Sequence, residues 1–372
     1  MKTRKLSIYF FSGTGNALKT SEWVAEVAEN AGISYKVVSI DRMPQAATPD
    51  AGDGEMVGFV FPTHGFNLPW YMLKFIWRFP QSQNTGFFVI NTRAGMKISR
   101  FIFLPGLSGI AWMLPVIILW FKGYSLKGLM SVDMPSNWIS LHPGLKPKVV
   151  DSLSQRWEKK VKRFAEKLFA NGKSFKTKLF ISLPIDIAII PISILYMLYA
   201  RYFLSKTFLA ATNCNLCRLC EENCPVKAIQ IRDNRPYWTL QCESCMRCIN
   251  ICPQKAIQTS HSFAAVMIAL TASLPVSYYL NVFFTKIFGI SSPFFELFAF
   301  LSGLLVFVFL FYLLYKLLFY FIRFSWINKM FTYTSFTRFW RHYIARGVNM
   351  PVFKKYRQTE NMSKSENESP IG

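Results

Sequence analysis

LSIYFFSGTGNA, residues 6–17, decides how the first part of the chain folds. Residues 6–11 form a short apolar run, which predicts a buried β-strand. A turn of small and hydroxyl residues follows, and residues 17–30 have the apolar spacing of an amphipathic helix. The residues expected on one face of that helix are Leu18, Ser21, Val24, Ala25 and Ala28. The stretch therefore predicts a strand, a loop and a helix in immediate succession.

The same pattern recurs along the next hundred residues. Further strand-like runs lie at residues 35–40, 56–61, 86–91 and 127–133. Strands that alternate with connections long enough for helices are typical of a doubly wound parallel sheet with helices on both faces. We therefore expect residues 1–175 to form an α/β domain.

Ligands of such a sheet bind beyond the carboxyl ends of the strands, so the turns there are candidate site residues. The three turns are Ser12-Gly13-Thr14-Gly15-Asn16-Ala17, Pro62-Thr63-His64-Gly65 and Asn91-Thr92-Arg93-Ala94-Gly95. The first turn opens a helix and can hold a phosphate with backbone N–H groups and hydroxyls. It is neither a P-loop nor a dinucleotide fingerprint, because the Gly-Lys-Ser/Thr and the third glycine are missing.

The first turn resembles the phosphate loop of the flavodoxin family, which runs Ser/Thr-x-Thr-Gly-x-Ser/Thr after the first strand. Ala17 departs from that pattern and removes one phosphate hydrogen bond. The resemblance implies a strand order of 2-1-3-4-5 and bound FMN, with the other two turns at the isoalloxazine ring and Phe66, Trp70 or Tyr71 stacked on it. The alternative is a flavodoxin-like sheet that has lost its cofactor. His64 is either a redox-linked proton group or a loop residue bonded to backbone.

All eight cysteines lie between residues 214 and 252, in two runs of identical spacing. The runs are Cys214-x2-Cys217-x2-Cys220-x3-Cys224-Pro225 and Cys242-x2-Cys245-x2-Cys248-x3-Cys252-Pro253. In this motif three cysteines bind one [4Fe–4S] cubane, and the fourth cysteine of each run binds the other. The expected sets are Cys214, Cys217, Cys220 and Cys252 for cluster one, and Cys242, Cys245, Cys248 and Cys224 for cluster two.

Over about 45 residues this block resembles a bacterial ferredoxin with two [4Fe–4S] clusters. Structural zinc and four disulfides are the alternatives. Zinc sites usually show two separated CxxC pairs, and disulfides are disfavoured in the cytoplasm. We expect an α+β ferredoxin-type domain at residues 206–260, whose clusters pass electrons because each iron has its protein ligand.

The composition combines a net charge of +23 with 52% hydrophobic residues. A disordered basic chain is excluded, because such chains are poor in apolar residues. Either a nucleic-acid binder with a large core or a membrane protein would fit. Residues 262–285 and 297–315 have no charged residue and are each long enough to cross a bilayer. We therefore expect a transmembrane helical hairpin at residues 262–322.

The segment at residues 323–372 is predicted to be a basic, aromatic tail. Residues 323–357 carry eight Lys or Arg and no acidic residue, which favours contact with anionic lipid headgroups on the cytoplasmic side. Single-stranded nucleic-acid binders share this composition, but the position after a span favours the lipid bilayer over nucleic acid. Residues 359–372 are polar and expected to be disordered. With no secretion signal at the N-terminus, we expect the bacterial cytoplasmic (inner) membrane, with both redox domains facing the cytoplasm.

Two further apolar stretches need a place. Residues 101–121 have the length of a membrane span, but insertion would break the sheet, so we expect a connector with a buried helix that touches the membrane surface. Residues 176–205 are expected to form a re-entrant or interfacial helix pair, broken at Pro184 and Pro191. Asp186 in that segment is a proton-relay carboxylate or an ordinary cap residue.

Residues 1–260 as a whole resemble the EFR-type ferrodoxins, in which a flavodoxin-like half is fused to a ferredoxin module. The stretch Met134-Pro135-Ser136-Asn137-Trp138 matches that family's Met-Pro-x-Asn-aromatic motif. The resemblance implies an electron-transfer protein linking FMN to two clusters, and the anchor suggests a quinone or protein redox partner. The alternatives are a redox-sensing or assembly subunit without flavin, and a flavin-dependent reductase of a quinone or small molecule that uses His64 and Arg93.

Overall fold

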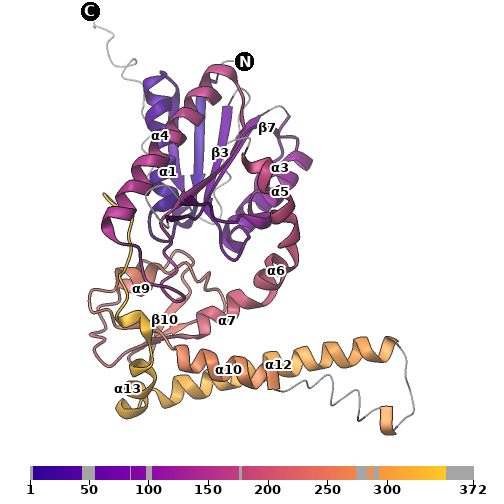
Figure 1. The fold of residues 1–372 in the computed structure, drawn as a ribbon, viewed down its shortest axis with the longest axis vertical. Coiled ribbons are helices and arrows are strands. Elements are labelled where there is room, and N and C mark those ends of the chain that lie inside the picture. The colour runs from indigo at the N-terminus through magenta and orange to yellow at the C-terminus, as the bar shows by residue number, and fades with distance from the viewer. Residues whose placement is uncertain are drawn as a thin grey trace, which may run out of the picture.

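A computed structural model gives the fold of the chain (Figure 1). It describes residues 3–43, 55–83, 85–97, 103–175, 178–273, 283, 285–287 and 293–348. Figure 1 shows an α/β unit at the top, the cysteine-bearing unit below it, and two long helices that run to one side at the base.

A parallel sheet forms the centre of the N-terminal unit. Its strands are β1 (Lys5–Phe10), β2 (Ser34–Ser39), β3 (Glu55–Pro62), β4 (Gly86–Ala94), β7 (Ser125–Met134) and β8 (Ser174–Phe175). They lie in the order β2-β1-β3-β4-β7-β8, and each neighbouring pair is parallel. The first five positions are the 2-1-3-4-5 order of a flavodoxin-like sheet. The five predicted strands and their order are confirmed, and β8 is an additional edge strand.

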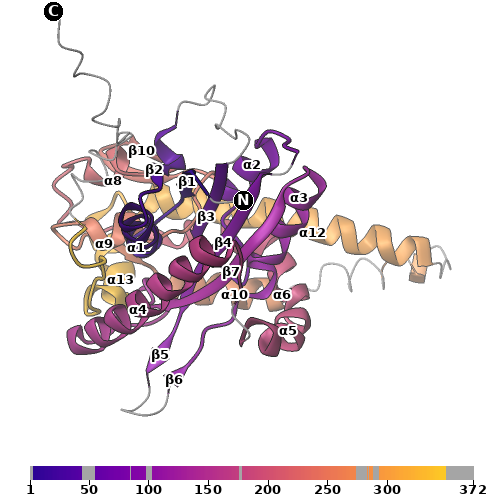
Figure 2. The ribbon, with the colours of Figure 1, turned by 90° about the horizontal axis from the view of Figure 1, so that it is seen from above.

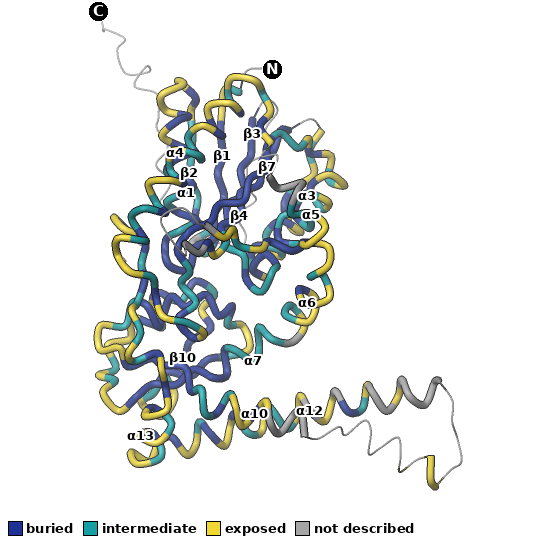
Figure 3. The backbone as a smooth tube through the Cα atoms, viewed as in Figure 1, coloured by how far each residue is buried: buried dark blue, intermediate teal, exposed yellow. Residues whose placement is uncertain are grey.

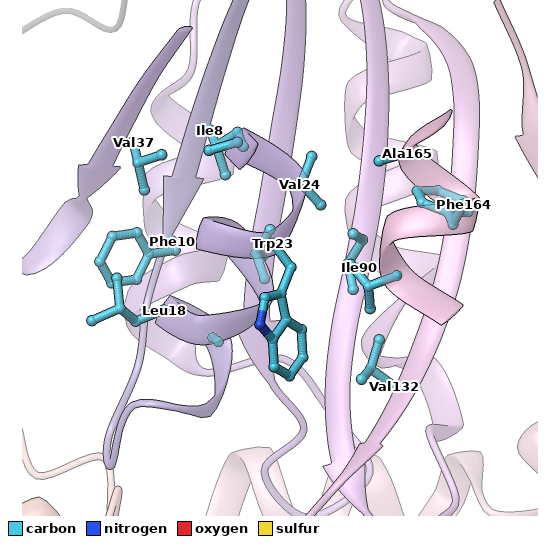
Figure 4. Close-up of a cluster of buried hydrophobic side chains, with 14 of the residues drawn as sticks. Ile8, Phe10, Leu18, Trp23, Val24, Val37, Ile90, Val132, Phe164 and Ala165 are labelled. Atoms are coloured by element: carbon cyan, nitrogen blue, oxygen red, sulfur yellow. The ribbon is translucent and has the colours of Figure 1, made fainter. Parts of the chain in front are cut away.

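Helices cover both faces of the sheet (Figures 1 and 2). The helices of the two layers are α1 (Asn16–Asn30) and α4 (Pro147–Asn171) on one face, and α2 (Trp70–Arg78) and α3 (Met113–Phe121) on the other. Successive side chains along β1 point to opposite faces of the sheet, so this strand contributes apolar side chains to both helical layers. Ile8 and Phe10 pack into the layer of α1 and α4, shown in Figure 4, and Tyr9 and Phe11 pack into the opposite layer.

Helix α1 confirms the helical face expected from the sequence. Its five predicted face residues are all buried. In Figure 4, Leu18, Trp23 and Val24 of this helix lie against side chains of the neighbouring strands. This packing fixes the start of α1 directly after β1, so the loop between them lies at the carboxyl edge of the sheet.

The cysteine-bearing unit is a small α+β domain built from two similar halves. Its elements are β9 (Phe208–Ala210), α8 (Leu219–Glu222), β10 (Ile229–Arg232), β11 (Arg235–Trp238), α9 (Arg247–Ile251) and β12 (Ile257–Thr259). β10 pairs antiparallel with β11, and β12 pairs antiparallel with β9. Phe208, Trp238 and Ile249 form part of the core between the two halves.

The apolar stretch at residues 101–121 leaves the sheet intact, as expected. It contains the short strand β6 (Phe103–Leu104), paired with β5 (Met96–Lys97), then the 3-10 turn η2 (Gly109–Ala111) and α3. The expected buried helix is only half buried. Leu119 is fully buried in the sheet layer, whereas Trp120 and Phe121 are 66% and 76% exposed. Strand β7 then returns beside β4.

The connector between the two redox units is helical. It consists of α5 (Lys178–Ala188), α6 (Ile190–Leu195), the π-helix η3 (Tyr196–Ala200) and α7 (Arg201–Lys206). The expected break at Pro184 is wrong, because this proline lies inside α5. The other expected break is present, because α5 ends before Ile189 and Pro191 stands in the first turn of α6. Asp186 is fully buried and accepts hydrogen bonds from the backbone N–H groups of Ser108 (3.1 Å) and Gly109 (2.9 Å). It therefore anchors the loop before α3.

The two predicted spans overlap the helices α10 (His261–Ser273) and α12 (Pro293–Phe321). Most of the rest of the first expected span, from residue 274 on, lies outside the described residues. Among the described residues, one helix is long and apolar enough to cross a membrane: Leu301–Phe321, with a mean hydropathy of 2.3. Figure 3 shows that much of the described part of α12 is exposed.

The remaining short elements are η1 (Ile40–Arg42), α13 (Ser325–Tyr333) and η4 (Phe336–Arg338). The tail after α13 turns back toward the N-terminal unit (Figure 1). The predicted disorder at residues 359–372 falls outside the described residues.

Candidate functional site

The first ring of cysteines surrounds one cavity. Cys214, Cys217, Cys220 and Cys252 all line it, and the space not filled by protein atoms is about 370 Å³, part of it open solvent. Three of these side chains come from the first run and the fourth from the second run. This is the set expected for cluster one.

The second ring gathers the other four cysteines. Burial raises the pKa of the Cys248 thiol well above its usual range, and the nearby thiols of Cys242, Cys245 and Cys224 add to this shift. Burial likewise raises the pKa of Cys245 to about 11. Thiolates in such surroundings need a bound cation to compensate their charge. The grouping matches the set expected for cluster two.

The loops around the two rings repeat each other in backbone conformation. Left-handed residues recur at equivalent positions of the two runs: Leu216 and Ser244, Arg218 and Met246, Lys227 and Lys255. The fourth cysteine of each run accepts an N–H···S bond, from Ala228 to Cys224 at 3.2 Å and from Ala256 to Cys252 at 3.3 Å. Hydrogen bonds to the sulfurs help to set cluster potentials.

The cysteine chemistry suits clusters better than either alternative. All eight cysteines are free, so the structure contains none of the four disulfides considered above. Within the described part of the chain, no three His, Cys, Asp or Glu side chains are grouped around a single metal ion. The eight thiols instead gather in two sets of four, and the first set lines one cavity.

The loop at residues 12–17 lies at the N-terminus of α1. The Ser12 hydroxyl accepts a hydrogen bond from the N–H of Gly15 at 3.0 Å, and this closes the loop. Asn16 donates its amide to the carbonyl of Pro135 at 2.9 Å. The N-terminus of α1 adds the favourable end of its dipole, so the loop can hold an anion.

The three predicted turns converge on one cavity, as the strand order requires. The space not filled by protein atoms is about 520 Å³, part of it open solvent, within the range of about 300–1,000 Å³ for small-molecule sites. Its lining residues are Ser12, Gly13, Thr14, Asn16, Ala17, Pro62, Thr63, His64, Thr92, Arg93, Ala94, Pro135, Ser136, Asn137 and Trp138. The predicted residues Gly15, Gly65, Asn91 and Gly95 are not among the lining residues.

Asn91 and Arg93 are held by polar contacts beneath the cavity. The Asn91 amide donates to the hydroxyls of Thr63 (2.9 Å) and Ser108 (3.0 Å). Arg93 forms a 2.6 Å ion pair with the buried carboxylate of Asp133. The guanidinium is therefore fixed in place, which leaves it a binding group rather than a proton donor.

His64 is buried at the edge of the cavity. Burial lowers its pKa to about 4, so the imidazole is neutral at neutral pH. Its backbone forms a two-way bridge with Asn67, with N···O distances of 2.8 and 3.0 Å. The Nδ1 atom has no hydrogen-bond partner among the described residues.

The aromatic side chain in the cavity wall is Trp138. The three aromatic residues expected to stack on a flavin ring, Phe66, Trp70 and Tyr71, are not among the lining residues. Trp138 belongs to the segment that follows β7, which the sequence pattern singled out only by its resemblance to EFR-type ferrodoxins.

That segment joins the cavity to the cysteine-bearing unit. Asn137 donates to the Thr14 hydroxyl at 3.0 Å and to the carbonyl of Cys245 at 3.4 Å. Trp138 donates its indole N–H to the carbonyl of Ser244 at 3.3 Å. A Cβ added to Gly13 would overlap the Cys245 carbonyl oxygen. The anion-binding loop and the loop of cluster two are therefore in direct contact.

Arg247 fills the centre of this contact and was missed from the sequence. Its side chain is 2% exposed and forms a 3.1 Å ion pair with Asp41, which is equally buried. It donates to the carbonyls of Gly13 (3.0 Å) and Asn223 (2.9 Å), and also to that of Ser12. One guanidinium thus ties the anion-binding loop to both cysteine runs. No local signal separates it from the many basic residues of the chain.

The C-terminal segment also reaches the loop, although its sequence predicted a membrane contact. The backbone N–H of Ala345 donates to the Thr14 carbonyl at 2.8 Å, and the Tyr343 hydroxyl donates to Asn16 at 2.6 Å. Tyr343 also joins the cysteine-bearing unit, because its backbone N–H donates to Asn250 at 2.7 Å.

Comparison with known protein families supports the assignment of the cysteine-bearing unit as an iron–sulfur domain. Residues 213–257 match the family of the 4Fe-4S dicluster domain, so this segment is a dicluster domain and its cofactors are [4Fe–4S] clusters. No curated protein matches the chain.

Solved structures resemble the N-terminal unit. A flavodoxin of Streptococcus pneumonia TIGR4 is 15% identical and covers 42% of this chain and 97% of its own, with a TM-score of 0.28. An NAD(P)H:quinone oxidoreductase from Methanothermobacter marburgensis is 14% identical, with coverages of 44% and 95% and a TM-score of 0.31. General stress protein 14 from Treponema denticola, in complex with FMN, is 7% identical, with coverages of 44% and 99% and a TM-score of 0.29. The fold assignment rests on the strand order rather than on these likenesses.

Proposed function

We propose that the protein is a membrane-associated iron–sulfur flavoprotein that passes electrons between FMN and two [4Fe–4S] clusters, and on to a quinone or protein redox partner. The observation that carries the proposal is the direct contact between the loop at residues 12–17 and the loop of cluster two. Within it, Arg247 bonds to both Ser12 and Gly13. A cofactor in the first loop would lie beside a one-electron carrier.

The residues that line the cavity are of the chemical types that bind FMN. The N-terminus of α1 with Ser12 and Thr14 would hold the phosphate, and the turns of His64 and Arg93 with Trp138 would surround the ring. The bound flavin would supply exchange of electrons singly or in pairs. The chain's own residues position it, exclude water, and fix its distance to cluster two.

The arrangement of motifs also leads us to propose membership of the EFR-type ferrodoxin family. The stretch at residues 134–138 supports this proposal, because its members Ser136, Asn137 and Trp138 line the cavity and bridge it to the cluster loop. A motif with this structural position has a reason to recur in proteins that join the two units.

A membrane contact of the same protein is supported by two exposed apolar surfaces. The first is α12. The second consists of side chains on α3, α5, α6 and η3: Ile117, Trp120, Phe121, Ile185, Ile187, Ile192, Ile194, Leu195 and Leu198, each at least 47% exposed. In both Figure 1 and Figure 2, α3, α5 and α6 lie on the side toward which α12 projects. Exposed apolar patches of this kind mark interaction sites. We propose the cytoplasmic face of a bacterial inner membrane as the location.

Flavin extraction combined with EPR of the dithionite-reduced membrane fraction tests the proposal. We expect an acid-releasable flavin, two reducible clusters, and visible absorbance that dithionite bleaches. A colourless, metal-free protein after anaerobic reconstitution would contradict it.

Changing both Leu305 and Val308 to Asp adds about 2.5–3.5 kcal/mol per residue to the cost of insertion, so we expect the double variant to leave the membrane fraction. Its retention there after an alkaline wash would contradict the anchor.

A redox-sensing or assembly subunit without flavin is the second candidate. It is favoured by the Asn16 side chain, which is already bonded to Pro135 and Tyr343, and by Ala17, which lacks a hydroxyl. This candidate predicts both clusters but no stoichiometric flavin in the same preparation.

A further inference from the structure

A second, smaller cavity lies behind the candidate flavin site. It is lined by residues that include His64, Asn67, Trp70, Tyr196, Arg201 and Glu243, and the space not filled by protein atoms is about 200 Å³, part of it open solvent. These residues come from the turn after β3, from the helical connector, and from the loop between the cluster ligands Cys242 and Cys245. His64 lines both cavities, so the two sites share a wall.

The polar atoms around this cavity are unusual because four of them are buried and unpaired. The Nδ1 of His64, the Nδ2 of Asn67, the hydroxyl of Tyr196 and the Nε of Arg201 have no hydrogen-bond partner in the part of the chain that the structure describes. Each such atom costs about 1–3 kcal/mol when it stays unsatisfied. Four of them from two separate segments, around one cavity, indicate a polar occupant.

The chemistry of the four atoms defines that occupant. Asn67 Nδ2 and Arg201 Nε can only donate a hydrogen bond, whereas the Tyr196 hydroxyl and the neutral His64 ring can accept one. The occupant must therefore accept two hydrogen bonds and donate two. A water molecule does so, and buried waters typically make two to four bonds to otherwise unsatisfied groups.

The surroundings hold these side chains in place. The Tyr196 ring packs so closely against the turn at residues 62–65 that a Cβ added to Gly65 would overlap it. The centroid of this ring lies 6.1 Å from that of Trp138. Ser193 of α6 donates to the carbonyl of Phe66 at 2.9 Å. On the other side, the backbone N–H of Trp70 donates to Glu243 at 3.1 Å. The cavity is thus fixed by both redox units and by the connector between them.

We propose that this cavity binds an ordered water molecule which, with Tyr196 and His64, relays protons to the redox cofactor at the turn of residues 62–65. The relay rests on the proposed function. For every two electrons that the clusters deliver, one from each, the relay carries two protons from solvent to the cofactor site, so that charge is balanced. The water passes protons on and is neither consumed nor formed.

A high-resolution crystal structure of the anaerobic holoprotein tests the water site without reference to flavin. We expect density for one water within hydrogen-bond distance of Asn67 Nδ2, Arg201 Nε, Tyr196 Oη and His64 Nδ1. A cavity that is empty, or that holds a different occupant, would overturn the site. This measurement separates the inference from the proposed function, because it applies equally to a protein that carries no flavin.

The relay is tested by the rate at which pre-reduced clusters reduce the flavin, measured in H2O and D2O. Tyr196→Phe and His64→Gln should slow this step by about 10²-fold or more, since general acid–base groups contribute about 10²–10⁴, and should change the solvent isotope effect. In Tyr196→Phe the flavin content and the cluster EPR spectra should stay unchanged, because Tyr196 does not line the candidate flavin cavity. Tyr202→Phe is the matched control, because the Tyr202 hydroxyl bonds to Arg201 but Tyr202 does not line the cavity. A wild-type rate and isotope effect in Tyr196→Phe would overturn the relay even if the water is present.

Discussion

The two cysteine runs have the same spacing but different surroundings. In the first run Cys217 is exposed, and the loop around it faces the outside of the molecule. In the second run Cys245 and Cys248 are buried, and their loop lies against the anion-binding loop of the α/β unit. Leu219 and Arg247 occupy equivalent positions of the two runs and show the contrast best. Leu219 is 38% exposed, whereas Arg247 is 2% exposed. A duplicated motif has thus become an outer cluster site and an inner one.

On the proposed function, electrons pass between an external partner and the candidate flavin site by way of both clusters, with cluster one on the outer side. The exposed ring of cluster one is open to an external partner, and the buried ring of cluster two adjoins the candidate flavin site. Burial and hydrogen bonds around the sulfurs also separate cluster potentials. Variants that change one cysteine run at a time test whether the two cluster sites differ in this way.

The largest effect is expected from loss of a cluster ligand. Cys248→Ala and Cys217→Ala should each disturb one cluster, which holds about half of the protein's iron. Only the Cys248 variant should abolish flavin reduction by chemically reduced clusters, because it removes the inner carrier. Iron analysis, EPR and stopped-flow absorbance measure these outcomes. Equal loss of flavin reduction in both variants would show that the two clusters are not ordered as inner and outer.

The next largest effect is expected at Arg247. Arg247→Ala leaves the buried carboxylate of Asp41 without its partner, and breaking a buried pair in this way costs about 3–5 kcal/mol. The control is Leu219→Ala at the equivalent exposed position, where the cost should stay below about 1 kcal/mol. Anaerobic denaturant titration measures both. Similar values for the two variants would contradict the asymmetry of the halves.

A pH-dependent effect is expected from His64, which lies on the inner side only. Its folded-state pKa of about 4 lies below the usual 6.5, so the unfolded chain binds this proton first as the pH falls. The contribution to stability is complete above about pH 6.5 and is lost down to about pH 4, amounting to about 3 kcal/mol in all. Unfolding free energies of the wild type and of His64→Gln at pH 7 and 5.5 measure it. An equal pH dependence in the two proteins would rule out this source.

A smaller effect is expected from Gly13→Ala. The added methyl group would overlap the Cys245 carbonyl and push the two loops apart, and such overpacking costs about 1–3 kcal/mol. We also expect slower electron transfer to the flavin. Gly86→Ala is the control, because its methyl group would first meet the flexible side chain of Lys127, at 3.0 Å. Unchanged transfer in Gly13→Ala would show that this contact does not set the distance.

Local patterns predicted most of the fold and the grouping of the cysteines. The five strands, helix α1 and the two cysteine sets follow from periodicity and spacing, which depend on neighbouring residues. Arg247, Asn137 and the segment around Ala345 could not be predicted in this way, because their roles come from contacts with residues more than a hundred positions away. Pro184 shows the opposite limit, because α5 continues through a proline that the local rule expects to break a helix.

The contact of Ala345 with Thr14 has a consequence for how the molecule is made. The anion-binding loop leaves the ribosome before its cover, because the segment around Ala345 follows both cysteine runs and the apolar helix α12 in the chain. During synthesis the loop is therefore open on a side that the finished protein closes. Cofactor entry before the chain is complete, and retention afterwards, would make the order of translation part of how the protein acquires its flavin.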